Sequence, residues 1–185
     1  MSVRLGFIGC GGIANHHMRT IAKIPEAQMV AFYDKDAERA QKAAAEYGGC
    51  AYDSVTRMLD DAGLDGCYMC TPPFAHGEEE LAVVDRGLGL FLEKPVANNM
   101  KTAREIEKAI NEAGIVNAVG YHWRYMPNVR RAEEALAEKT VTAVLGYWMG
   151  GLPGVYWWRR MDLSGGQMVE QTTHIVDLAR LFGGE

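Results

Sequence analysis

Residues 3–14 read Val-Arg-Leu-Gly-Phe-Ile-Gly-Cys-Gly-Gly-Ile-Ala, a short apolar strand that runs into a glycine-rich turn and then a helix. The turn has the pattern Gly9-x-Gly11-x-x-Ala14. Gly9 permits a tight turn, Gly11 lets the backbone approach a pyrophosphate without a Cβ in the way, and the small Ala14 lets the helix pack closely on the strand. The free N–H groups at the helix start, with the positive end of its dipole, then face the phosphates. The stretch predicts a dinucleotide-binding turn.

An acidic residue in the next strand supports this interpretation. Asp34 ends the stretch Gln28-Met-Val-Ala-Phe-Tyr-Asp34. A carboxylate at this place can accept hydrogen bonds from both ribose hydroxyls of the adenosine. It would also repel a 2′-phosphate, although Lys35 beside it partly offsets the repulsion. We therefore expect NAD as the cofactor, in preference to NADP.

Composition and charge exclude several classes of partner. The chain has 185 residues and a formal net charge of -5, and it has no basic run interleaved with aromatic residues, so we expect no nucleic-acid surface. No apolar stretch approaches the ~18 to 20 residues of a membrane span. The apolar N-terminal run is a short strand that leads into the glycine turn. It has no basic region before it and no small-residue cleavage site after it, as a signal peptide would, so a cytoplasmic location is expected.

Two of the four cysteines have the C-x-x-C spacing of metal and redox sites. Cys67 and Cys70, however, lie in an apolar stretch typical of a buried parallel strand. Their odd separation sends the two side chains to opposite faces of the sheet. We interpret them as buried free thiols and expect no metal site.

Residues 1–121 alternate short apolar runs with amphipathic stretches, which indicates an α/β fold with a doubly wound parallel sheet of the Rossmann type, covered on both faces. Further strands are expected at 50–52, 65–70, 88–92 and 115–119, and helices at 36–48, 54–59, 74–86 and 100–113. This dinucleotide-binding domain is expected to end at residue 121.

Residues 122–185 follow a different pattern and are expected to form part of a second domain. A helix at about 127–138 precedes 141–149, where alternate residues are apolar as in a half-buried strand. An aromatic loop at 150–160 and a helix at about 167–182 follow. A single long strand cannot make a sheet, so the second domain looks unfinished. We expect the chain either to self-associate through the edge of this strand or to be a fragment of a longer protein.

Three segments follow strands of the expected parallel sheet, at the edge where ligands of such sheets bind. They are Thr71-Pro72-Pro73 with His76, Glu93-Lys94-Pro95, and Tyr121 to Tyr125. Pro95 favours an extended backbone at Lys94, so that its ammonium can project toward the nicotinamide end of a dinucleotide and stabilise an alkoxide.

The last helix carries two further candidates. Glu170 and His174 are spaced i and i+4 and would share one helix face. A histidine suits proton transfer coupled to hydride transfer, and a carboxylate one turn away can orient it. A hydrogen-bonded core histidine is the alternative.

Together these motifs resemble the glucose-fructose oxidoreductase, inositol dehydrogenase and MocA (Gfo/Idh/MocA) family. The matching stretches are Gly9-x-Gly-Gly-Ile-Ala14, Thr71-Pro-Pro-x-x-His76, Glu93-Lys-Pro95, Trp123-Arg-Tyr-x-Pro127 and Gly165-Gly-Gln-Met-Val-Glu-Gln-Thr-Thr-His-Ile-Val-Asp177. The resemblance implies a nucleotide-binding domain followed by an α+β domain with an open antiparallel sheet. It also implies hydride exchange between NAD(H) or NADP(H) and a sugar, polyol or related compound. Members of the family extend well beyond the last helix here, and many have aspartate where this chain has Glu170.

On these grounds we expect three groups of site residues. The catalytic residues are Lys94, His174 and Glu170. The cofactor-binding residues are Gly9, Gly11, Gly12, Ile13, Asp34, Thr71, Pro72, His76, Glu93, Lys94, Trp123 and Arg124. The substrate-binding residues are Lys94, His122, Trp157, Trp158, Arg159, Glu170 and His174, with packing as the alternative for the aromatic ones.

Two other functions remain open from the sequence. A regulatory or inactive module would hold the dinucleotide without turnover. A lyase or glycosidase of a related type would oxidise its substrate transiently and release product without net NADH.

Overall fold

The computed structural model describes residues 2–184. They form two compact units, an N-terminal unit that ends at residue 119 and a C-terminal unit that begins at residue 120. The strands of the N-terminal unit are β1 (Val3–Ile8), β2 (Ala27–Tyr33), β3 (Cys50–Ala51), β4 (Gly66–Met69), β5 (Gly89–Leu92) and β6 (Asn117–Val119). Its helices are α1 (Gly12–Ile21), α2 (Ala37–Tyr47), α3 (Val55–Asp61), the short 3₁₀ helix η1 (Pro73–Ala75), α4 (Glu78–Asp85) and α5 (Met100–Ala113).

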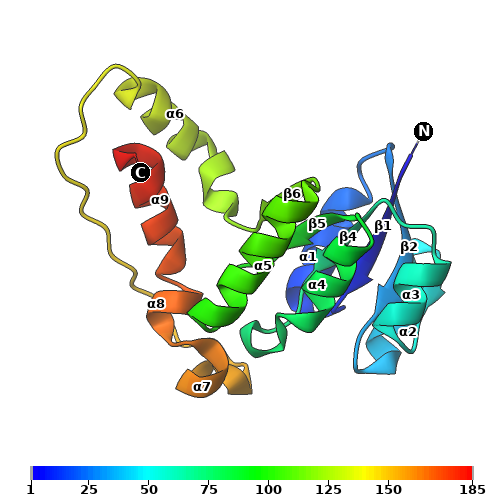
Figure 1. Ribbon diagram of the computed structural model, residues 1–185. Coiled ribbons are helices and arrows are strands. Elements are labelled where there is room, and N and C mark those ends of the chain that lie inside the picture. Colours follow the sequence, from blue (N-terminus) through cyan, green and yellow to red (C-terminus); the bar gives the residue numbers. More distant parts are fainter. Residues whose placement is uncertain (1, 185) are drawn as a thin grey trace. The chain divides into compact units, whose positions relative to one another are not determined.

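The six strands form one parallel sheet in the order β3-β2-β1-β4-β5-β6. The predicted doubly wound sheet is therefore confirmed (Figure 1). The strand order reverses direction between β1 and β4. In an open parallel sheet this switch point, at the carboxyl ends of the strands, is where ligands bind.

Helices cover both faces of the sheet. On one face α3, α4 and α5 pack on a core that includes Met58, Val83 and Ile106. On the other, α1 and α2 pack on a core around Phe7 and Phe32. Cys67 belongs to the first core and Cys70 to the second, as the alternation of a strand requires. Burial raises the pKa of the Cys67 thiol to about 12, which keeps the thiol protonated and unreactive.

Local sequence signals explain both ends of α5. The predicted helix 100–113 is observed with these bounds, begun by the Asn99 side chain, which accepts a hydrogen bond from Thr102 N–H at 3.0 Å, and ended by Gly114 at a φ of +61°. The predicted continuous helix 74–86 is wrong. Gly77 has a φ of +141°, which separates η1 from α4 and leaves His76 before the helix instead of in its first turn.

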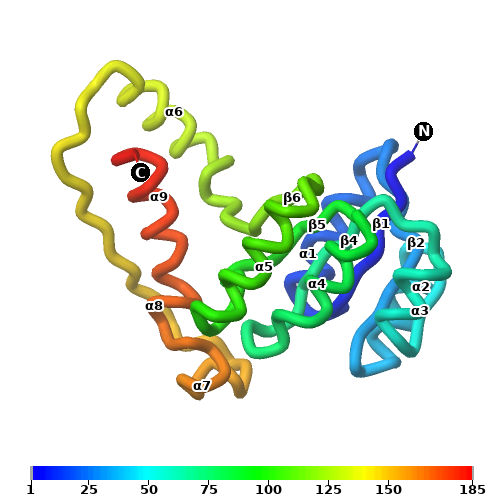
Figure 2. Tube along the Cα trace, in the orientation of Figure 1, coloured from blue at the N-terminus to red at the C-terminus, as the bar shows by residue number. Residues whose placement is uncertain are grey.

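The C-terminal unit contains η2 (His122–Tyr125), α6 (Pro127–Leu136), η3 (Tyr156–Arg159), α7 (Met161–Ser164), α8 (Gln167–Glu170) and α9 (Thr173–Gly183). Helices α6 and α9 lie side by side, and the run between α6 and η3 forms an open arc beyond them (Figure 2).

The predicted strand at 141–149 is wrong for the chain as described. Residues 140–153 form no strand, and Leu145, Tyr147 and Met149 are 94%, 71% and 85% exposed. A strand requires a neighbour for its backbone groups, and residues 2–184 supply none there. The expected antiparallel sheet is likewise not observed in this range.

The predicted single helix 167–182 is also wrong. The helix breaks at Gln171 and Thr172, where the Thr172 N–H reaches back to the Gln167 carbonyl and the His174 N–H to the Gln171 carbonyl. Glu170 thus ends α8 and His174 lies in the first turn of α9, so the two residues do not share the face of one helix.

Within the described range, no helix is both long and apolar enough to cross a bilayer.

Candidate functional site

The glycine turn has the shape that a bound pyrophosphate requires. Gly9 has a φ of +89°, and a Cβ there would stand 2.6 Å from the Cys70 carbonyl oxygen, so only glycine fits between β1 and β4. At Gly11 and Gly12 the corresponding position has no heavy atom of the described residues within 4 Å beyond the chain neighbours. Helix α1 begins there without a side-chain cap and without an acidic residue in its first turn. The turn therefore offers open space and uncapped N–H groups to an anion, at Gly11, Gly12 and Ile13.

Asp34 lies beside this turn, directly after β2. Its Oδ2 accepts a hydrogen bond from Cys10 N–H at 2.8 Å, and its Oδ1 accepts one from Asp36 N–H at 2.9 Å. These bonds fix the carboxylate next to the glycine turn. Each oxygen keeps a second lone pair, so the group can still accept hydroxyl hydrogen bonds.

The segment after β4, which begins at Thr71, is held in place by the buried side chains of His76 and Glu80. The His76 ring contacts Glu80 Oε1 through Nδ1 at 2.5 Å and the Thr71 carbonyl oxygen through Nε2 at 3.1 Å. Glu80 Oε2 also accepts a hydrogen bond from Gly77 N–H at 2.6 Å. Both ring nitrogens of His76 have partners inside the unit, so His76 holds this loop in place, and its contact with a cofactor stays a prediction.

Thr71 and Pro72 lie at the start of the same loop. The Thr71 hydroxyl is buried and has no hydrogen-bond partner among the described residues. A buried polar group without a partner is costly, and a hydroxyl at the switch point is suited to a ligand that supplies one.

Glu79 lies in the same region, and no sequence motif marks it as a site residue. Burial, together with the nearby charges of Glu80 and Asp34, raises the pKa of its carboxyl to about 7. The run Glu78-Glu79-Glu80 resembles a solvated acidic face in the sequence. Only the fold reveals that its members differ in burial, from exposed Glu78 to fully buried Glu80.

Lys94 lies just beyond β5, at the same edge of the sheet. Glu93 before it is 6% exposed and donates its N–H to the Met69 carbonyl at 2.9 Å, and the peptide bond between Lys94 and Pro95 is cis. Glu93 Oε1 lies 2.6 Å from His17 Nε2, a contact that the sequence did not predict. A cation at this position is suited to stabilising negative charge on an oxygen.

In the C-terminal unit, aromatic rings surround His174. The imidazole is 5% exposed and stacks on the Trp123 ring, with centroids 4.9 Å apart and planes at 12°. The His122 ring meets it edge-on at 5.1 Å, and Trp148 packs against both Trp123 and His174. Trp148 was not predicted, because it belongs to the run that the sequence assigned to a strand. The cluster fixes the orientation of the imidazole ring.

Arg124 forms an ion pair within the same unit. Its guanidinium makes a bidentate contact with Asp177, with distances of 2.6 to 2.9 Å. The hydrogen bond to Asp177 raises the pKa of Arg124. This pair connects η2 to α9 one turn beyond His174. Trp123 and Arg124 are predicted to contact the cofactor. Within the C-terminal unit Trp123 stacks on His174, and Arg124 binds Asp177 of the same helix.

The aromatic residues of the loop differ in exposure, from exposed Tyr156 to buried Trp158. Trp158 is buried at 9% exposure and packs against Trp157 with ring centroids 6.5 Å apart. Arg159 is exposed, and Arg160 pairs with Asp162 at 2.6 Å. Glu170, at the end of α8, is 7% exposed.

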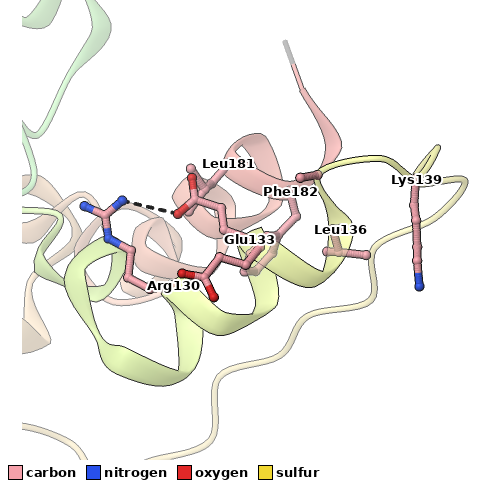
Figure 3. Close-up of a pocket in the computed structure, with 8 residues that line it drawn as sticks. Arg130, Glu133, Leu136, Lys139, Leu181 and Phe182 are labelled. Carbon is pink, nitrogen blue, oxygen red and sulfur yellow. Dashed lines mark hydrogen bonds and ion pairs between the residues drawn. The ribbon is translucent and has the colours of Figure 1, made fainter.

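A groove of about 550 Å³ lies between α6 and α9 (Figure 3). Its lining combines apolar side chains, including Leu181 and Phe182, with charged ones such as Arg130 and Glu133, which pair at 3.5 Å. None of the predicted site residues lines it.

The chain matches two protein families. Residues 3–121 match the family described as an oxidoreductase family with an NAD-binding Rossmann fold, GFO_IDH_MocA. Residues 124–185 match an oxidoreductase C-terminal domain.

Individual relatives are similar over nearly the whole chain. The 1,5-anhydro-D-fructose reductase of Ensifer adhaerens is 29% identical over 184 residues, covering 96% of this chain and 55% of the relative. The D-xylose 1-dehydrogenase (NADP(+)) 2 of Haloferax volcanii is 29% identical, covering 97% and 57%. The structure of the WlbA dehydrogenase of Bordetella pertussis, in complex with NADH and UDP-GlcNAcA, is 25% identical with a TM-score of 0.88, covering 99% of this chain and 57% of that one. The chain spans little more than half the length of these relatives.

Proposed function

The chain belongs to the oxidoreductase family with an NAD-binding Rossmann fold, and on this premise we propose that it serves hydride transfer between a nicotinamide cofactor and a hydroxyl or carbonyl group of a sugar, polyol or related compound. The observation that carries the proposal is the uncapped glycine turn at the switch point, with Asp34 fixed beside it and Lys94 at the same edge of the sheet. The names of the relatives, which are sugar reductases and dehydrogenases, support the substrate class.

Each proposed residue has a defined task. The nicotinamide cofactor supplies the hydride acceptor or donor. Lys94 stabilises negative charge on the substrate oxygen, and His174 takes the hydroxyl proton in oxidation or returns it in reduction. Glu170 remains a proposed neighbour of that chemistry, and His122, Trp157, Trp158 and Arg159 remain proposed substrate contacts.

A direct assay tests the proposal. The purified chain is mixed with NAD⁺ and a panel of sugars and polyols, and NADH formation is followed by its absorbance. NADH that accumulates with at least one substrate supports the proposal. Product without net NADH would instead indicate lyase or glycosidase chemistry.

We expect Asp34→Ser to narrow or invert the preference for NAD over NADP. The substitution removes the charge that repels a 2′-phosphate and replaces the two carboxylate oxygens that would accept the ribose hydroxyls with one shorter hydroxyl, so NADH affinity should fall about tenfold. Titration of NADH and NADPH against both proteins measures the change. Asp36→Ser, which removes a charge two residues away, is the control and should leave the ratio unchanged. Tighter binding of NADPH than NADH by the wild-type chain would contradict the preference.

We also expect the chain to self-associate through residues 141–149, because the exposed apolar side chains and unpaired backbone of this run form a surface that a second copy can cover. Light scattering should give a mass above the 20.4 kDa of one chain. Leu145→Lys should shift the population toward monomer, whereas Val116→Lys, at an 85% exposed site in the N-terminal unit, should not. A monomer with full activity would show that this surface needs no partner.

A further inference from the structure

One hydrogen bond connects the helix after the glycine turn to the residue before Lys94. His17 lies in α1 and Glu93 follows β5, and His17 Nε2 and Glu93 Oε1 are 2.6 Å apart. Their side chains are 19% and 8% exposed. A hydrogen bond to a carboxylate that is shielded from water is stronger than one at the surface.

Packing fixes the orientation of the His17 ring. Its centroid lies 5.6 Å from that of Tyr68 on β4 and 5.0 Å from that of Phe91 on β5. Tyr68 and Phe91 themselves stack at 4.5 Å. The imidazole is thus wedged against two neighbouring strands with Nε2 directed at Glu93.

The second carboxylate oxygen of Glu93 binds the backbone of Lys94. Glu93 Oε2 accepts a hydrogen bond from the Lys94 backbone N–H at 3.1 Å. The Glu93 N–H is bound in turn to the Met69 carbonyl. Glu93 therefore holds the backbone from which the lysine side chain departs, and His17 holds Glu93.

We propose that His17 is a positioning residue that, through Glu93, locks the Lys94 backbone to α1. Because α1 begins at the glycine turn, the same helix presents its N-terminus to the cofactor's phosphates and aligns the lysine that acts on the substrate. The effect of His17 on turnover rests on the proposed role of Lys94. The positioning of the Lys94 backbone by His17 and Glu93 can be tested without turnover.

Four variants of the full chain separate positioning from packing. His17→Phe keeps an aromatic ring between Tyr68 and Phe91 but removes the nitrogen that faces Glu93. His17→Gln supplies an amide nitrogen in place of Nε2 and should restore the bond. His16→Phe is the matched control, since His16 is the neighbouring exposed histidine of the same helix. Glu93→Gln removes the charge from the other side of the contact, in case His17→Phe does not fold.

The main readout is hydrogen exchange of the Lys94 amide, followed by nuclear magnetic resonance. Loss of a hydrogen bond to a carboxylate should accelerate exchange of this amide about tenfold in His17→Phe and in Glu93→Gln. His17→Gln and His16→Phe should exchange at the wild-type rate. Turnover should fall by about tenfold in His17→Phe and recover in His17→Gln, while NAD affinity stays within about threefold of wild type.

A wild-type exchange rate for the Lys94 amide in folded His17→Phe and Glu93→Gln would overturn the proposal. Equal acceleration in His17→Gln and His16→Phe would also overturn it, since it would reveal a general loosening of α1. A wild-type chain without turnover would refute the proposed function alone, because the exchange measurement still decides whether His17 positions Lys94.

Discussion

Lys94→Ala is expected to lower kcat by about a hundredfold while leaving NAD affinity nearly unchanged. The ammonium is proposed to stabilise the alkoxide that develops on the substrate, an interaction that is strongest in the transition state and therefore appears in kcat. Lys94→Arg keeps the charge but spreads it over a planar group and should recover only part of the rate.

Steady-state kinetics and NADH titration measure the two quantities. Lys101→Ala removes an exposed lysine of α5 and serves as the control for a general charge effect. Near-normal turnover in Lys94→Ala would remove this residue from the mechanism.

His174→Phe is expected to lower kcat by a similar factor of about a hundred, because the substitution removes the group that is proposed to take the hydroxyl proton. Phenylalanine keeps an aromatic ring against Trp123 and Trp148, so the cluster around it should persist. Glu170→Gln should have a milder effect if the carboxylate only orients the histidine.

Thermal unfolding of each variant distinguishes a lost proton acceptor from a disrupted cluster. An unchanged melting temperature together with a hundredfold lower kcat in His174→Phe supports the catalytic role of His174. Turnover near the wild-type level in folded His174→Phe would mean that His174 is a packed core residue, the alternative that the sequence left open.

The sheet of the N-terminal unit could be predicted because its signals are local. Each strand is an apolar run followed by an amphipathic stretch, and the turn at Gly9 and the acid at Asp34 are the local features from which a dinucleotide site was predicted. The faces of Cys67 and Cys70 followed from strand geometry alone. The glycine that breaks the helix near His76 was missed because its φ of +141° is a property of the folded loop.

The C-terminal unit could be predicted less well, because its structure depends on contacts between distant residues. The alternation in 141–149 is real, but a strand needs a neighbour that residues 2–184 do not supply. The 3.6-residue periodicity of 167–182 cannot reveal the break at Gln171. Trp148, Asp177 and His17 acquire their roles from residues 25 to 76 positions away, and no local pattern marks such pairs.

The most direct test of the account is whether hydride passes from a substrate carbon to the cofactor on this chain. A sugar or polyol that carries deuterium at the oxidised carbon is incubated with the chain and NAD⁺, and the reduced cofactor is analysed by mass spectrometry. The account predicts deuterated NADH, formed about a hundredfold more slowly by Lys94→Ala. A chain that binds NAD⁺ but yields no deuterated cofactor from any substrate of the panel would instead be a module that holds the dinucleotide without turnover.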